Sequence, residues 1–343
     1  MRNSRKYLFG STSKNAFLFI LFFAGILFSS CERDNEDPVG PNLQDRFGPF
    51  ALLSELSLNR DSVDFAAGEN VVFNAEFNKN VNWIITVIGL ESGAEFTIEG
   101  FSRMINSENA VWTGRTSELP FFKAEPCSVE LIVPEEGDFM ETAEVTVLEP
   151  RVYSGSLYTD FEENPAINIV NPEFELTGNS GISSVITPAQ GDFILLLEGT
   201  DNVVPNYFVG LAELSPQING NEYVQFPTTV PENLYFNFFM YNDGRPHGVA
   251  VIQFHFDSND NGVFDDGPDQ TFQLEGDYPL DFTGWRKFSH TMADVGISQA
   301  QLEKVVMIRV LLISIRDTQP SPKLEVQLGL DYITFTTGAP FQL

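Results

Sequence analysis

The chain has 343 residues, and its 48 Asp and Glu against 19 Lys and Arg give a formal net charge of −29. Such a surface argues against nucleic acid as a partner, because phosphate contacts need Lys and Arg, and against direct docking on anionic lipid. Its two cysteines, Cys31 and Cys127, offer no disulfide framework, while 43% apolar residues suffice for ordinary hydrophobic cores.

Residues 1–30 have the organisation of a bacterial secretory signal. The first 14 residues hold four basic side chains and no acid, and a 13-residue apolar stretch, Ala16–Phe28, follows. The small residues Ser29 and Ser30 then precede Cys31. A basic head, a short apolar run and a small-residue cleavage site are typical of secretion. The run is shorter than the roughly 20 residues that a membrane-spanning helix needs.

Leu27–Cys31 resembles the lipobox of bacterial lipoproteins. The resemblance implies cleavage before Cys31 and lipidation of its thiol and new amino group. A triacylated Cys31 would carry more than one acyl chain. That would be enough to anchor the protein, since stable membrane attachment takes about two lipid signals. The alternative is an ordinary signal peptide with a cysteine nearby.

Residues 31–49 are polar, acidic and contain Pro and Gly, so they are predicted to form a tether. The run Glu32–Asp37 directly after Cys31 resembles the signal that sends lipoproteins of the Bacteroidota to the outer face of the outer membrane. The resemblance implies an outer-membrane, lipid-anchored protein that faces the cell exterior. A merely solvated linker is the alternative.

Residues 50–149 are predicted to form short strands separated by turns, as in a β-sandwich. The expected strands include 70–77, 81–90, 94–101, 128–134 and 141–148. The Trp112-Thr113-Gly114 turn, followed by Phe121-Phe122 and the run Cys127–Leu131, resembles the closing half of bacterial immunoglobulin-like domains. Cys127 begins a strand-like run and is expected to be buried and inert.

Residues 150–343 are predicted to form a second all-β domain that begins at Pro150. Nine strand-like runs suggest a sandwich or jelly roll. The runs are 156–161, 192–198, 207–214, 234–241, 249–257, 270–274, 285–290, 305–315 and 323–336. Only Ser298–Lys304 has a helical pattern, with Ser298 as its N-cap.

The stretch from Asp257 to Asp269 matches part of a calcium-binding loop, D-x-N-x-N-G-x-x-D. Calcium takes several oxygen ligands at once, and a glycine at the sixth position permits the sharp turn. The expected ligands are Asp257, Asn259, Asn261, Asp265, Asp269 and the carbonyl of Val263. The twelfth position is Pro268 rather than Glu. A hairpin turn without metal, which the same residue types favour, is the alternative.

Several segments of residues 150–343 resemble the galactose-binding-like, carbohydrate-binding-module-like β-sandwiches of surface lipoproteins and carbohydrate-active enzymes. They are Tyr158–Glu162, Val251–Gly262, Asp269–Phe272, Phe282–Ser289 and Gly329–Phe335. The resemblance implies a jelly roll, sometimes with a glycan site, and often with a structural calcium. The matching positions for that second calcium are Asp160, Glu162 and Asp331, which are otherwise polar residues at a sheet edge.

The loop from Tyr241 to His247 is a candidate ligand site, because loops on rigid sandwiches often carry function. It gathers Tyr241, Asn242, Asp243 and Arg245, although an ordinary polar hairpin would look the same. Trp285 could stack on a sugar but, at the start of an alternating strand, is expected in a core.

No motif for nucleophilic catalysis or phosphate binding is present, and the three histidines are scattered. We therefore expect a non-catalytic glycan-binding accessory with a structural calcium. A structural or protein-interaction subunit of an envelope complex is the alternative, and an enzyme such as a glycan hydrolase comes third. Two or three exposed aromatic side chains on the second sandwich would favour glycan binding, whereas a broad apolar patch would favour a protein partner.

Overall fold

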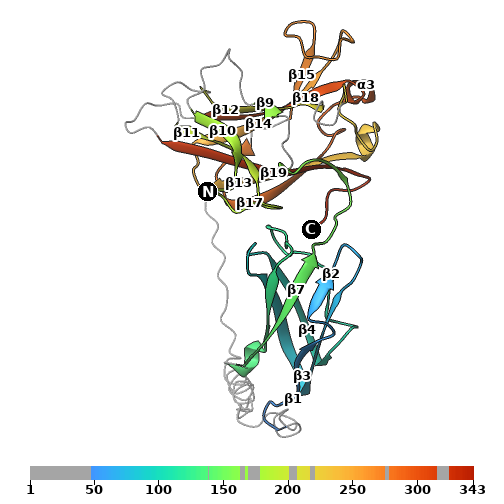
Figure 1. The fold of residues 1–343 in the computed structure, drawn as a ribbon, viewed down its shortest axis with the longest axis vertical. Helices are drawn as coiled ribbons and strands as arrows, with labels where there is room; N and C mark the ends of the chain where they lie inside the picture. Colours follow the sequence, from blue (N-terminus) through green and yellow to red (C-terminus); the bar gives the residue numbers. More distant parts are fainter. Residues whose placement is uncertain are drawn as a thin grey trace, which may run out of the picture. The chain divides into compact units, whose positions relative to one another are not determined.

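The computed structural model describes residues 48–137, 139–162, 167–168, 178–200, 207–216, 221–274, 278–314 and 324–343. The chain divides into two compact units, Met1–Phe50 and Ala51–Leu343. The second unit consists almost entirely of strands, which confirms the all-β prediction (Figure 1). Its described helical segments are α3 (Gln299–Leu302) and the 3-10 turns η1 (Pro134–Glu136) and η3 (Pro231–Asn233).

The first seven strands form a sheet in the order β1-β3-β6-β7-β2, to which β4 and β5 add by pairing with β3. These strands are β1 (Leu52–Leu58), β2 (Ser62–Asp64), β3 (Val71–Gly89), β4 (Glu95–Ile105), β5 (Val111–Trp112), β6 (Pro126–Ile132) and β7 (Met140–Glu149). Pairing is antiparallel except between β2 and β7. The immunoglobulin-like resemblance stays a prediction.

The strand β3 corrects one expectation, because the runs predicted at 70–77 and 81–90 are a single strand of 19 residues. Its centre stays extended where Asn78 exchanges hydrogen bonds with Ala51 of the neighbouring chain segment. Alternate side chains along both halves are buried, including Phe73, Trp83 and Ile85. The period of two was therefore read correctly, and the polar residues between the halves mark a register irregularity rather than a turn.

The remaining strands form two six-stranded sheets, with orders β10-β11-β19-β13-β17 plus β8, and β15-β14-β18-β12-β9 plus β16. The strands are β8 (Ser156–Thr159), β9 (Ile167–Asn168), β10 (Gly178–Ser183), β11 (Ile194–Thr200), β12 (Tyr207–Leu214), β13 (Leu234–Asp243), β14 (Gly248–Phe256), β15 (Gln270–Gln273), β16 (Tyr278–Pro279), β17 (Thr283–Thr291), β18 (Val305–Ser314) and β19 (Glu325–Thr337). All nine strands predicted here are present.

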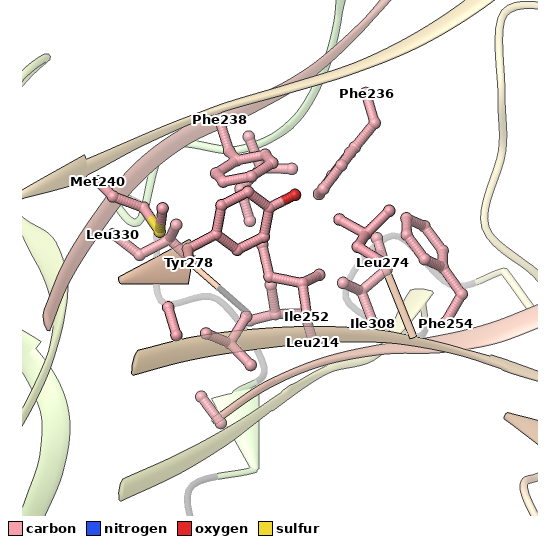
Figure 2. Packing of buried hydrophobic residues seen from close by; sticks show 14 of the residues in the cluster. Leu214, Phe236, Phe238, Met240, Ile252, Phe254, Leu274, Tyr278, Ile308 and Leu330 are labelled. Carbon is pink, nitrogen blue, oxygen red and sulfur yellow. The ribbon is translucent and has the colours of Figure 1, made fainter. Parts of the chain in front are cut away.

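One large core lies between these two sheets. Figure 2 shows its side chains pointing toward one another from both sheets, with the Tyr278 ring beneath Phe238. Burying a side chain of this size contributes about 1.5–3 kcal/mol, so the core fixes the register of the strands. The predicted helix is confirmed as α3, where Ser298 and Gln301 form a capping box. The division at Pro150 stays a prediction, although β1–β7 and β8–β19 belong to separate sheets.

Candidate functional site

Two aromatic side chains lie side by side on the outer face of the β13–β17 sheet. Tyr241 of β13 is directly opposite Trp285 of β17, and their ring centroids are 5.5 Å apart. Phe238 and Met240 of β13 enter the main core, so Tyr241 faces the other way by strand alternation. Trp285 is half-buried and packs against the smaller apolar cluster of this face rather than in the main core. Its indole N–H donates to the Thr187 carbonyl at 2.9 Å.

A pocket of about 400 Å³ opens beside these rings. It is lined by Ser92, Pro120, Val185, Ile186, Thr187, Tyr241 and Trp285. Gly329 of the neighbouring strand β19 lies beneath, where an added Cβ would come within 3.0 Å of the Tyr241 Cβ. The absence of a side chain at Gly329 therefore leaves room for the ring. The pocket combines aromatic surface with a few polar atoms, as ligand sites commonly do.

A buried carboxylate fixes the loop that carries Ser92. Glu125 accepts hydrogen bonds from the backbone N–H groups of Glu91, Ser92 and Lys123 at 2.7–2.9 Å, and from the Ser92 hydroxyl at 2.5 Å. Burial alone would raise the pKa of Glu125, but these donors hold it below its ordinary value. Glu125 is therefore ionised at neutral pH and positions one wall of the pocket.

The predicted ligand loop turns out to be a tightly hydrogen-bonded turn. The buried Asn242 accepts from the N–H groups of Gly244 and Arg245, and its amide donates to the Gln327 carbonyl. Arg245 is ion-paired with Asp243 at 2.8 Å and with Glu325 at 3.1 Å. Of the four predicted ligand residues, only Tyr241 lines the pocket.

The rest of the outer face beside Tyr241 is filled by a smaller apolar cluster. Phe121, Phe239 and Phe341 form its buried centre together with Ala189. The backbone N–H of Phe341 donates to Asn237 at 3.0 Å, and Lys287 donates to the Phe341 carbonyl at 2.7 Å. These contacts hold the Phe341 segment on the sheet, so the accessible part of this face is the end that carries Tyr241 and Trp285.

The predicted calcium loop folds around its own hydrogen bonds. Asp257 is buried and accepts from the Tyr223 hydroxyl and from the N–H groups of Gly262 and Asn259. Burial opposes ionisation, but these donors lower the pKa of Asp257 below its ordinary value. Gly262 has φ 78° and permits the turn.

The remaining predicted ligands of this loop bind donors of the loop as well. Asp265 accepts from the side-chain amides of Asn259 and Asn261, while Asp269 accepts from the N–H groups of Ser258 and Asp265. The two amide nitrogens, rather than their oxygens, therefore face the Asp265 carboxylate. A cation here would require both amides to turn, and calcium in this loop stays a prediction.

The weaker calcium prediction concerns residues that the fold brings together from distant segments. Asp331 is completely buried and accepts from the N–H groups of Gln190 and Tyr332. Glu162 accepts from Asp192 and Phe193 in the same connecting segment before β11. Burial, and then the nearby Glu162 charge, raise the pKa of Asp331 well above its ordinary value. The N–H donors of Gln190 and Tyr332 lower the pKa of Asp331, but they do not offset its burial.

Residues next to Asp331 and Glu162 adopt unusual backbone conformations. Phe161 and Tyr332, neighbours of the predicted ligands, both have positive φ angles of 64° and 47°. Gly191 has φ 65°, and a Cβ there would come within 2.2 Å of the Glu162 carboxylate. The absence of a Cβ at Gly191 leaves room for the Glu162 carboxylate, which accepts from the N–H groups of Asp192 and Phe193.

Within the described residues, no group of three or more His, Cys, Asp or Glu is arranged to hold a metal ion. A hard cation at Asp331 would thus need carbonyl oxygens beside the two carboxylates, which calcium accepts readily. His255 is buried beside Phe264, and burial followed by the Arg309 charge lowers its pKa to about 3. It is therefore neutral at physiological pH. Cys127 is buried, as expected, and burial raises its pKa to about 12.

The signal, the tether as far as residue 47, and Cys31 lie outside the described residues. In the described part of the chain, no helix is long and apolar enough to cross a bilayer.

Sequence reasoning missed most of the pocket. Ser92, Pro120 and the segment 185–187 come from connections far apart in the sequence, and no local pattern marks them. For Trp285, the alternating pattern of β17 indicates packing, and it does not show that part of the ring borders a pocket.

No protein-family model and no curated protein matches the chain. Solved structures resemble it distantly. A carbohydrate-binding module of the β-sandwich superfamily shares 13% identity over 83% of this chain and 97% of its own, with a TM-score of 0.35. SGBP-B from a xyloglucan utilization locus of Bacteroides uniformis shares 12% identity over 82% and 72%, with a TM-score of 0.35.

A xylan-binding domain from Paenibacillus barcinonensis Xyn10C covers 55% of this chain and 97% of its own at 11% identity, with a TM-score of 0.31. Likenesses at this distance do not define a ligand for this chain.

Proposed function

We propose that this chain is a non-catalytic lipoprotein, displayed on the outer membrane and anchored through Cys31, that binds a neutral glycan beside Tyr241 and Trp285. The single observation that carries the glycan proposal is the pocket of about 400 Å³ next to these two rings. Aromatic side chains bring a large apolar surface with specific geometry, which suits the apolar faces of sugar rings. The indole N–H already binds Thr187, so Trp285 would contribute its ring face.

The charges near the pocket support a neutral ligand. Asp243 and Glu325 both pair with Arg245, so the one cation in this turn is already neutralised. An acidic glycan would meet a protein with net charge −29 and no free cation in the Tyr241–Arg245 turn. The same ion pairs also leave Asp243 and Glu325 poorly suited to act as a catalytic acid and base.

We further propose that a structural calcium ion binds at Asp331 and Glu162. The support is the buried Asp331 carboxylate, whose pKa is raised by burial and by the Glu162 charge. Bringing a cation to such a pair would offset the cost of burying the charge. The ion would stabilise the connection between β8 and β11, and it would take no part in binding sugar.

A glycan array probed with residues 48–343 tests the glycan proposal. We expect binding to neutral glycans, loss of at least tenfold in affinity with Trp285→Ala or Tyr241→Ala, and partial retention with Trp285→Phe, which keeps a ring. Phe101→Ala is the matched control, since Phe101 is an aromatic residue that is 65% exposed elsewhere. Thermal melts check that each variant is folded. Binding that survives both alanine variants, or no binding to any neutral glycan, would contradict the proposal.

A Cys31→Ala variant tests the anchor. We expect this full-length variant to leave the membrane fraction, whereas wild type stays there. Variant protein that remains in the membrane would show that lipid on Cys31 is not the anchor.

A further inference from the structure

The first sheet presents an outward face that no contact described so far explains. The register aligns Ile84 of β3 with Glu99 of β4 on one side and with Ile132 of β6 on the other. Ile132 in turn pairs with Met140 of β7. Apolar side chains therefore form a row across three neighbouring strands, and a contiguous row of this kind commonly marks an interaction site.

Phe101 extends this row along β4. It lies two residues beyond Glu99, within diagonal reach of Ile84, and its side chain is 65% exposed. Met140 at the other end is 57% exposed. We call the area defined by Phe101, Ile84, Ile132 and Met140 the Phe101–Met140 face.

A hollow of about 360 Å³ lies within the Phe101–Met140 face. It is lined by Asn82, Trp83, Ile84, Glu99, Gly100 and Pro134. The Trp83 ring lies directly under the strand at Gly100, where a Cβ would come within 2.3 Å of it. The Trp83 ring itself is buried, so the hollow offers the aliphatic Ile84 and Pro134 and the Glu99 carboxylate, which suit the stem and head of a long cationic side chain.

The charges around the Phe101–Met140 face are mainly acidic. Outward positions of the four strands carry Glu95, Glu99, Glu130 and Glu144, while the basic Arg103 also lies outward on β4, two residues from Phe101. Nearby cations of this sheet are paired with other carboxylates, as Lys79 is with Glu136 and Arg103 with Glu76. A second copy of the chain would bring the same acids to the contact, so self-association is disfavoured.

We propose that the Phe101–Met140 face docks an extended protein segment in which Lys or Arg residues alternate with apolar ones. Such a segment places cations against Glu99 and Glu130 and apolar side chains against Phe101, Ile84 and Met140. Charge complementarity of this kind governs the partner chosen and the rate of association. The proposal is independent of glycan binding, since the two sites share no residue.

Selection from a phage library of random 12-residue peptides on residues 48–343 tests this proposal. We expect enriched peptides to combine Lys or Arg with apolar residues. Their affinity, measured by fluorescence anisotropy, should fall at least tenfold in the double variant Phe101→Ser, Met140→Ser. It should also fall with added salt, and less steeply in Glu99→Gln.

Leu148→Ser is the matched control. Leu148 is on the same strand as Met140 and is 52% exposed, but it lies eight residues, or about 27 Å, away. It should bind like wild type. Failure to enrich any peptide, enrichment of acidic peptides, equal binding by the double variant, or dimerisation of wild type in sedimentation would overturn the proposal.

Discussion

The loop at residues 257–269 and the region around Asp331 of β19 each bring carboxylates together. They differ in how far apart those residues lie in the sequence and in how the charges are compensated. The loop is contiguous in sequence, and its carboxylates accept hydrogen bonds from the same loop and from Tyr223. The Asp331 site joins segments about 170 residues apart, and its buried carboxylate faces a second acid, Glu162. The contiguous acids of the loop are thus compensated by local donors, whereas burial opposes the charge of Asp331.

Glu125 supplies the intermediate case. Its carboxylate accepts from four donors and its pKa is lowered, whereas Asp331 lies deeper, accepts from the N–H groups of Gln190 and Tyr332, and has a raised pKa. Deeper burial and fewer donors together oppose the Asp331 charge. Substitutions at these carboxylates and at their glycine neighbours test this distinction.

The largest change in unfolding free energy should come from adding calcium, and it should depend on Asp331. With calcium at 100 times its Kd, wild type should gain about 2.7 kcal/mol of unfolding free energy over EDTA. Asp331→Asn should lose this gain. In EDTA it should change stability little, because burial already opposes the Asp331 charge, although one of its two N–H donors loses its acceptor. Chemical denaturation with and without calcium measures both. Asp257→Asn is the control and should keep the gain; equal gains in wild type and Asp331→Asn would contradict the account.

The next effect concerns Glu125 and has a defined pH dependence. At pH 7, Glu125→Gln should lower the unfolding free energy by about 1.5–3 kcal/mol, the range for hydrogen bonds to a charged group. Because the folded pKa is lowered, the contribution is present above the unfolded value of about 4.3 and is lost as the pH falls through the folded value. Denaturation at a series of pH values should show the difference shrinking below about pH 4. A difference that is constant with pH, or equal to that of the exposed control Glu144→Gln, would refute it.

Two glycines provide a matched pair with a smaller effect. Gly191 and Gly262 both have positive φ, and a Cβ at each would meet a glutamate carboxylate, Glu162 and Glu222 respectively. Replacing either with Ala should cost about 1–2 kcal/mol for the left-handed backbone. Only Gly191→Ala should also lose the calcium gain, since only Glu162 belongs to the proposed site. If Gly262→Ala, and not Gly191→Ala, lost the calcium-dependent increase in unfolding free energy, the calcium site would be the Asp257 loop instead.

The smallest effect is expected at Asp265. The hydrogen bonds that Asp265 accepts from Asn259 and Asn261 are exposed to solvent. The amide oxygen of Asp265→Asn can still accept a hydrogen bond from them. The unfolding free energy should change by less than about 1 kcal/mol, equally with calcium and with EDTA. A larger, calcium-dependent loss would indicate that the loop is a metal site.

The sequence predicts the long strands of residues 150–343, but it misses the short strands β9, β10 and β16 and it does not predict the sites. Apolar runs indicate β12, β13 and β18, which are buried on both faces, whereas three polar residues that remain extended separate the two predicted halves of β3. The Asp257 motif coincides with a hydrogen-bonded turn, and calcium there stays a prediction. The pocket could not be predicted, because Thr187 and Ser92 reach Trp285 only through the packing of connections that share no local pattern.

The central claim is that the outer face of the second sandwich, assembled from distant strands, is the functional one. The most direct measurement is a crystal structure of residues 48–343 with the neutral oligosaccharide that binds best on the array. The account predicts a sugar ring against Trp285 and Tyr241. A sugar bound at the Asp257–Asp269 loop, or on the Phe101–Met140 face, would contradict it.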